Sequence, residues 1–364
     1  MGSSGYIIFL LMTIPVLVGL FFFIKSDRII WWESLSSIAV ALAVCSLTFA
    51  ISQCSSTRDT ETWSGQITRV EHTPEWDAEW EELETRYTTD SDGNSESYTV
   101  WVTKREHHEP EWTAITTIGE LTLSQGYYSH IVKEHGERSE RGYRPNYSKG
   151  DRNDYYSDVS DDPEFCNYPV TKVVNWRNPL KNAKGLHGFR EMGEDEANKL
   201  NLFDYPLNGN FKSSRLLGNP DIDIWNWDKM NAAIGAAKQV NVILINCTGR
   251  NQEFAKNQEI YWRGGKKNDL VLCYGEGWSY VFGWSQSQLI KQNLMTILID
   301  NPVDSAIIPL LKKEIRENFR PHEWEKYSDA SVPVPVGATI LAFIIVLLSQ
   351  TACYVLFHKN EFVK

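Results

Sequence analysis

The apolar residues of this chain are concentrated at its two ends, whereas its middle alternates between polar and apolar positions. Three long apolar runs occupy residues 6–24, 29–53 and 334–357, and Glu33 is the one charged residue within them. A helix needs about 20 predominantly apolar residues to cross the hydrocarbon layer of a bilayer. The pattern therefore predicts two transmembrane helices near the start of the chain and one near its end.

The charges beside these runs predict how the helices are oriented. The run 6–24 has no basic leader and no small-residue cleavage site after it, which favours an uncleaved helical hairpin over a signal peptide. Two basic residues lie between the first two runs, and two more follow the third (Lys25, Arg28, Lys359 and Lys364). Because positive charge is enriched on the cytoplasmic side, we expect a bacterial inner-membrane protein with a cytoplasmic C-terminus and a periplasmic body.

The external body begins with the pattern of antiparallel strands. Residues 62–70 alternate at period two, and residues 83–89 and 97–104 flank the turn-forming segment 90–94. This pattern predicts an antiparallel β arm over 58–133. The next segment, 134–224, has little periodicity, and we expect it to wrap irregularly around the domain that follows.

Residues 225–326 have the pattern of a small α/β domain. Helical spacing predicts a helix over 225–238, and the apolar run 240–246 predicts a strand buried on both faces. The further predicted elements are a helix over 251–262, a hairpin of strands 269–274 and 278–284, and an amphipathic helix over 307–319. The predicted fold class is α+β, with transmembrane helices flanking the β arm and the α/β domain.

This order of elements resembles the TPM-type domain, a small membrane-associated α/β domain. The likeness rests on four features: the helix before strand 240–246, the helix end at 262–265, the strand entry at 267–269, and the hairpin end at Gly283 and Trp284. The order of the whole chain also resembles that of membrane proteins found in bacteriophage and bacterial genomes. Both resemblances imply a domain that works beside a membrane.

Composition narrows the range of partners. The chain has 47 acidic and 36 basic residues, a formal net charge of −11. Such a charge is unsuited to a broad contact with nucleic acid or with anionic lipid headgroups, so we expect no nucleic-acid partner.

Six cysteines are too few for a disulfide framework in 364 residues. Cys247 and Cys273 fall on predicted neighbouring strands, where a disulfide is one interpretation and two buried thiols are the other. No CxxC motif is present, so a structural zinc knuckle is not indicated.

The sequence holds no Walker loop, dinucleotide glycine motif, HExxH or GxSxG. Asn268 and Asp269 are the candidate catalytic residues, because they begin a predicted strand and would lie near Trp284 at one edge of the sheet. Proteins with TPM-type domains include acid phosphatases and proteins that bind divalent cations, so the resemblance implies a catalytic or metal-binding role for Asp269. The alternative is that Asp269 only hydrogen-bonds the turn before it.

Two other groups of residues are candidate sites. Thr248 and Arg250 follow the first strand, and open α/β sheets often bind ligands beyond the carboxyl ends of their strands, so with Trp284 they are candidate ligand-binding residues. His72 and His107 are candidate metal ligands if opposed strands bring them together. The alternative is that both histidines lie on solvated, charged strand ends.

Two functions follow as hypotheses. The first is a membrane-anchored binding or scaffolding protein whose TPM-like domain engages another membrane or envelope component, or a second copy of the chain. The tryptophans of the β arm could then form a platform that binds a sugar or a partner; the alternative, which we favour, is that they cover a thin sheet. The second is a phosphatase that depends on a divalent cation, with no other cofactor expected.

Overall fold

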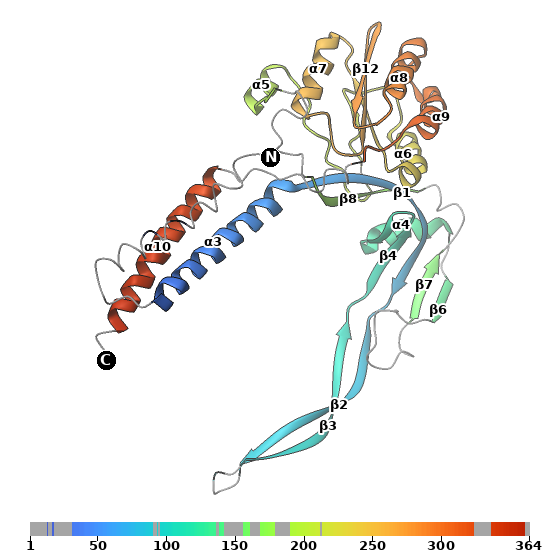
Figure 1. The fold of residues 1–364 in the computed structure, drawn as a ribbon. Coiled ribbons are helices and arrows are strands. Elements are labelled where there is room, and N and C mark those ends of the chain that lie inside the picture. The colour runs from blue at the N-terminus through green and yellow to red at the C-terminus, as the bar shows by residue number, and fades with distance from the viewer. Residues whose placement is uncertain are drawn as a thin grey trace.

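The computed structural model describes residues 31–89, 95–135, 138–141, 156–160, 168–178, 190–211, 213–323 and 336–360, together with Thr13, Leu17 and Gly93. Within these residues the fold is α+β. A body built from two sheets carries a β ribbon on one side and a pair of helices on the other (Figure 1). The predicted class α+β is therefore correct, whereas its membrane-spanning part is corrected below.

A four-stranded sheet forms the centre of the α/β domain. Its strands, in spatial order, are β12 (Trp278–Gly283), β11 (Asp269–Gly275), β10 (Asn241–Asn246) and β9 (Leu216–Leu217). The strands β9, β10 and β11 are parallel, and β12 is antiparallel to β11. The predicted strands β10, β11 and β12 are thus present. The strand β9 was not predicted, because two residues are too few to form a recognisable pattern.

Helices cover both faces of this sheet (Figure 1). The helices α6 (Ile224–Lys238), α8 (Gln288–Asp300) and α9 (Ile308–Asn318) enclose one core with Leu244 and Leu270. On the other face, α7 (Gln252–Tyr261) packs on Ile243 and Val271. Because helices cover both faces, β10 and β11 are apolar at nearly every position. The sequence predicted one closing helix, whereas the structure has two, α8 and α9, joined by the short 3-10 helix Ser305–Ile307.

A second sheet is organised around the long strand β1 (Arg58–Thr73). The first half of β1 pairs with β8 (Pro169–Arg177), and its second half pairs with β4 (Glu111–Thr116) and β7 (Tyr156–Ser160). The strands β5 (Gly119–Thr122) and β6 (Arg138–Arg141) extend the sheet on its two sides. The helix α4 (Gln125–His135) closes its core against Ile67 and Val70. The segment 134–224 therefore supplies three strands of this sheet, two of which pair with β1, as well as β9 of the other sheet and the short helix α5 (Glu194–Lys199).

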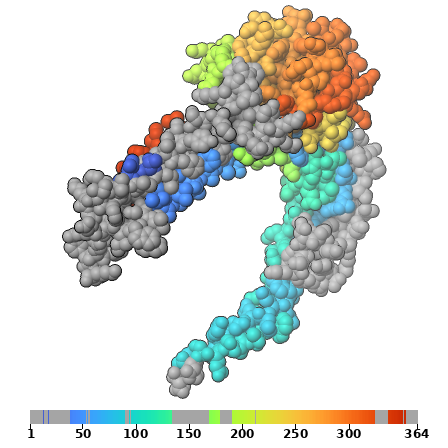
Figure 2. All heavy atoms as spheres, viewed as in Figure 1, coloured from blue at the N-terminus to red at the C-terminus, as the bar shows by residue number. Residues whose placement is uncertain are grey.

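The strands β2 (Trp76–Thr89) and β3 (Ser95–His108) form a two-stranded ribbon that projects from the body (Figures 1 and 2). The ribbon continues the pairing of β1 with β4 in the same register. The pairing is interrupted between the two ladders, at Pro74 and Pro110. Proline has no N–H to donate, so two prolines facing each other interrupt the ladder. The predicted hairpin 83–104 is present within a longer ribbon.

The helices α3 (Trp31–Thr57) and α10 (Val336–Asn360) run side by side away from the body (Figure 1). Ala41, Cys45 and Val346 are buried where the two helices pack. Outward-facing residues such as Leu47 and Leu348 are exposed.

The prediction of three transmembrane helices is contradicted. A span must combine a length of about 20 residues with a predominantly apolar sequence. Among the residues that the structure describes, no helix meets both conditions. The predicted spans over 29–53 and 334–357, and the inner-membrane placement derived from them, are therefore wrong. The run 6–24 lies outside the described residues apart from Thr13 and Leu17.

Candidate functional site

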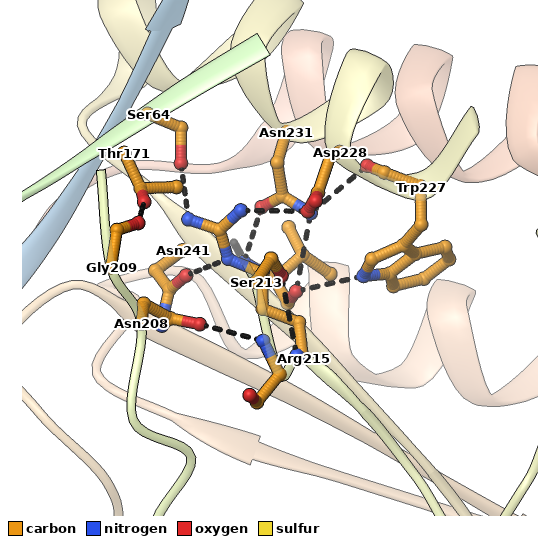
Figure 3. A network of polar contacts seen from close by, with 12 residues as sticks. Ser64, Thr171, Asn208, Gly209, Ser213, Arg215, Trp227, Asp228, Asn231 and Asn241 are labelled. Atoms are coloured by element: carbon orange, nitrogen blue, oxygen red, sulfur yellow. Dashed lines mark hydrogen bonds and ion pairs between the residues drawn. The ribbon is translucent and has the colours of Figure 1, made fainter. Parts of the chain in front are cut away.

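A buried arginine joins the two sheets (Figure 3). Arg215 directly precedes β9, and its side chain has no exposed surface. Its guanidinium donates from Nε to Asn241 Oδ1 at 2.6 Å, from Nη1 to Asp228 Oδ1 at 3.0 Å, and from Nη2 to Ser64 Oγ at 2.6 Å. One side chain thus connects β1, α6 and β10.

The charge of Arg215 is stabilised by a carboxylate and by neutral acceptors. Burial lowers the pKa of Arg215, and the nearby Asp228 opposes that change. For Asp228 the direction is reversed: burial raises the pKa of this carboxyl group, and the charge of Arg215 opposes the increase. A buried pair of this kind is costly to desolvate and becomes far more costly when one partner is removed. We therefore assign this cluster a role in fixing the fold, not in catalysis.

Further contacts along β1 extend this joint. Lys266 Nζ donates to Asp59 Oδ1 at 3.0 Å, and Asn178 Nδ2 donates to Asp59 Oδ2 at 2.8 Å. Lys267 lies 3.8 Å from the buried Glu61 carboxylate. The turn before β11 is therefore held against β1 by ionic contacts with both lysines.

Asp269, a predicted catalytic or metal-binding residue, is completely buried within the protein. Its oxygens accept hydrogen bonds from Asn241 Nδ2 at 2.8 Å, from the Lys266 amide at 2.6 Å, and from the Tyr205 hydroxyl at 2.8 and 3.0 Å. Burial raises the pKa of Asp269, and these hydrogen bonds oppose the change. A carboxylate surrounded in this way is not placed to meet a phosphate ester, so the geometry favours the alternative structural role.

Asn268, the second candidate catalytic residue, faces β1. Its Nδ2 donates to the carbonyl oxygen of Thr62 at 2.7 Å. Its Oδ1 is buried with no hydrogen-bond partner among the described residues. The predicted neighbours Asn268, Asp269 and Trp284 do lie at one edge of the sheet, since the Trp284 amide is 3.4 Å from the carbonyl oxygen of Asp269. Their side chains, however, do not converge on one accessible point.

Trp284 lines a cavity of about 520 Å³ at this edge. Its indole Nε1 donates to the carbonyl oxygen of Gly265 at 3.2 Å, which fixes the ring at the end of β12. The other lining residues include Glu259 of α7, Lys291 of α8 and His322 after α9. Of the three predicted ligand-binding residues, Trp284 is therefore the one that the structure places in a cavity.

Thr248 and Arg250 lie beyond the carboxyl end of β10, as predicted, but are held by neighbouring residues. The Thr248 hydroxyl donates to Asn246 Oδ1 at 2.6 Å. The Arg250 guanidinium lies 4.0 Å from the ring centre of Phe254 and donates to the carbonyl oxygen of Asn201 at 3.1 Å. Both side chains thus stabilise the loop after β10.

The structure does not bring the two candidate metal-binding histidines together. The ring of His72 stacks on Trp112, with ring centres 5.2 Å apart. His107 lies on the ribbon and shares a 2.8 Å hydrogen bond with Asp77. Throughout the described part of the chain, no three His, Cys, Asp or Glu residues are arranged to hold a metal ion.

Cys247 and Cys273 are neighbours, and both are buried free thiols. A hydrogen bond joins the two groups; burial raises the pKa of Cys273, whereas the hydrogen bond lowers that of Cys247. Of the two interpretations of this pair, the structure therefore has the buried thiols.

The ribbon carries an exposed apolar surface. Leu83 and Trp101 face each other across the two strands and are 50% and 66% exposed. Tyr87, on the same face nearer the tip, is 76% exposed. By contrast, Trp76 at the base stacks on His108, with ring centres 4.3 Å apart. The tryptophans of the arm thus divide into packed residues at the base and an exposed one in the middle.

The sequence did not reveal the Arg215 cluster. A lone arginine before two leucines has no distinguishing pattern, and the partners of its side chain lie in three separate segments. The pairing of Leu83 with Trp101 was easier to predict from the sequence. The turn at 90–94 fixes the register of the two strands, and this register places the two residues opposite each other.

Comparisons with known proteins give no assignment. No family model matches the chain, and neither a curated protein nor a solved structure matches it. The resemblances to the TPM-type domain and to phage or bacterial membrane proteins therefore find no support in these comparisons.

Proposed function

We propose that this protein is a binding or scaffolding protein that engages another protein through the β2–β3 ribbon. The observation that carries the proposal is the exposed cross-strand pair of Leu83 and Trp101. Large aromatic side chains such as tryptophan are enriched in the energetically dominant centres of protein interfaces.

The shape of the ribbon supports the same function. A two-stranded hairpin is marginally stable by itself in water, and here fourteen residue pairs extend away from the body. Both outer edges of such a ribbon present backbone donors and acceptors to a partner. The exposed face and the free edges together make a contact surface that the body does not cover.

The charge of the ribbon indicates the chemistry of the partner. The strand β2 carries five acidic residues and one arginine. Such a strand attracts a basic surface and repels a second copy of itself. The partner is therefore a different protein that presents basic residues beside an apolar pocket large enough for Trp101.

A peptide-display selection against the full chain tests this function. The selected peptides should be enriched in Lys, Arg and apolar residues, and their binding should weaken at least tenfold in the double variant Leu83→Ser/Trp101→Ser. Val100→Ser is the matched control, because Val100 lies on the opposite face of β3, and its binding should be unchanged.

Two outcomes would overturn the proposal. One is selection of peptides that bind the double variant as well as the native chain. The other is a concentration-dependent dimer, seen by light scattering, that the double variant abolishes, because the partner would then be a second copy.

A further inference from the structure

The cavity beside Trp284 has the size of a small-molecule site. Its volume of about 520 Å³ falls within the range of roughly 300–1,000 Å³ that is typical of ligand pockets. It lies on the α/β domain, where β12 ends, and is separate from the ribbon. Its lining mixes the rings of Trp284 and His322 with charged and amide side chains, among them Glu259, Gln288 and Lys291.

Lys291 is the cation of this cavity. Burial lowers its pKa, and the charge of Glu259 opposes that change. Within the described part of the chain, the Lys291 ammonium forms no hydrogen bond or salt bridge. A half-buried ammonium without an acceptor is a costly arrangement, and an anionic ligand would remove that cost.

The carboxylate of Glu259, whose charge acts on Lys291, already has a hydrogen-bond partner. Glu259 accepts a short hydrogen bond from the Tyr280 hydroxyl. Tyr280 therefore holds Glu259 at the wall of the cavity and leaves the lysine open to a second anion. The negative charge of Glu259 and of Glu323 on the lining also disfavours a ligand with more than one negative charge.

The start of α8 adds positive potential to the same cavity. The helix begins at Gln288, and its N-cap residue Ser287 makes no side-chain capping bond. Its first turn holds no acidic residue, so the helix dipole is uncompensated there. This contribution reinforces Lys291.

Trp284 supplies the apolar part of the site. Gly264 lies against one part of the indole, since a Cβ at that position would come within 3.0 Å of Cζ2. The ring of His322 lies 6.4 Å away, at an angle of 50°. The two rings therefore pack against each other at a tilt, and the indole of Trp284 is the large apolar surface on the wall of the cavity.

We infer that this cavity binds a small aromatic monocarboxylate, whose carboxylate contacts Lys291 and whose ring packs on Trp284. The site is independent of the ribbon, so a failure here leaves the proposed protein-binding function untouched.

Isothermal titration calorimetry on the full chain tests the inference with three probes of one shape. These are 1-naphthoate, its neutral amide, and the 1-naphthylmethylammonium cation. We expect 1-naphthoate to bind with a Kd on the order of 1 mM or tighter, as a fragment of this size allows. The amide and the cation should bind at least tenfold more weakly.

Two lysine variants assign the contact. Lys291→Gln should weaken 1-naphthoate binding at least tenfold, whereas Lys313→Gln, on the exposed side of α9, should leave it unchanged. Equal thermal midpoints for both variants would show that each is folded. Preferred binding of the cation, undiminished binding of 1-naphthoate to Lys291→Gln, or no binding of 1-naphthoate at ten times the expected Kd would each overturn the inference.

Discussion

The guanidinium of Arg215 donates a 2.6 Å hydrogen bond to the hydroxyl of Ser64, a residue 151 positions earlier in the chain. Because Ser64 lies on β1 and Arg215 directly precedes β9, this contact joins the sheet around β1 to the four-stranded sheet of the α/β domain (Figure 3). The base of the ribbon and the α/β domain are thereby held as one body.

Replacing Arg215 with methionine should destabilise the protein strongly. The variant keeps much of the side-chain volume but leaves Asp228 without its buried counter-ion and Asn241 without its donor. Loss of one partner of a buried ion pair costs about 3–5 kcal/mol of the free energy of unfolding, which urea denaturation would measure.

The matched control is Arg316→Met, at the exposed end of α9. Surface substitutions of this kind change the free energy of unfolding by less than about 0.5 kcal/mol. If the two variants were equally stable, the joint at Arg215 would not contribute to stability.

Gly235 marks the closest approach of α6 to β1. A Cβ at this position would come within 2.6 Å of the carbonyl oxygen of Ser64 and within 2.8 Å of its Cβ. Gly235→Ala should therefore push the helix from the strand and cost about 1–3 kcal/mol, measured by denaturant unfolding. Gly126→Ala in α4, where an added Cβ meets nothing within 4 Å, should cause no loss. Equal stability of the two variants would show that α6 can move away from β1 without cost.

His107 at the base of the ribbon should remain protonated to a higher pH than an ordinary histidine. Its hydrogen bond with Asp77 raises the pKa of His107. Because the folded pKa is raised, this contribution to stability is fully present below the ordinary value of about 6.5 and is lost as the pH rises through the folded pKa. An NMR titration of the His107 ring should show a raised pKa that falls in Asp77→Asn, and an unchanged value in that variant would exclude Asp77 as the cause.

The outer part of the ribbon should be dispensable for folding. Deleting 83–101 and joining Glu82 to Val102 through Asn-Gly preserves the register, because these two residues face each other. Since the removed residues of β2 and β3 are largely exposed, Tm should change by less than about 2 °C. A larger fall in Tm would show that the outer ribbon packs against the body, whereas loss of peptide binding alone would match the proposed function.

Local periodicity made the helices and strands of the α/β domain predictable. Residues whose contacts connect distant parts of the chain could not be predicted in this way. Alternation and helical spacing are carried by neighbouring residues, so β10, β11 and α6 follow from the sequence within a residue or two. The helix α8 was also within reach, because Ile290, Leu294 and Leu298 recur at a spacing of four and are buried.

The candidate site depends on contacts between distant segments, which local sequence patterns do not reveal. Asp269 begins a strand as predicted, but its donors Tyr205 and Asn241 come from other segments and turn a candidate catalytic acid into a buried structural group. The apolar runs were equally local signals. They predicted helices at α3 and α10, whereas the membrane-spanning interpretation is contradicted.

The interruption at Pro74 and Pro110 marks where the ribbon leaves the body, and the ribbon's length beyond it sets how far its tip extends. Fourteen residues beyond it, at roughly 3.3 Å each, carry the hairpin tip about 45 Å outward. A protein bound at the tip, as proposed above, would lie far from the cavity beside Trp284, so it would not obstruct a ligand bound in that cavity.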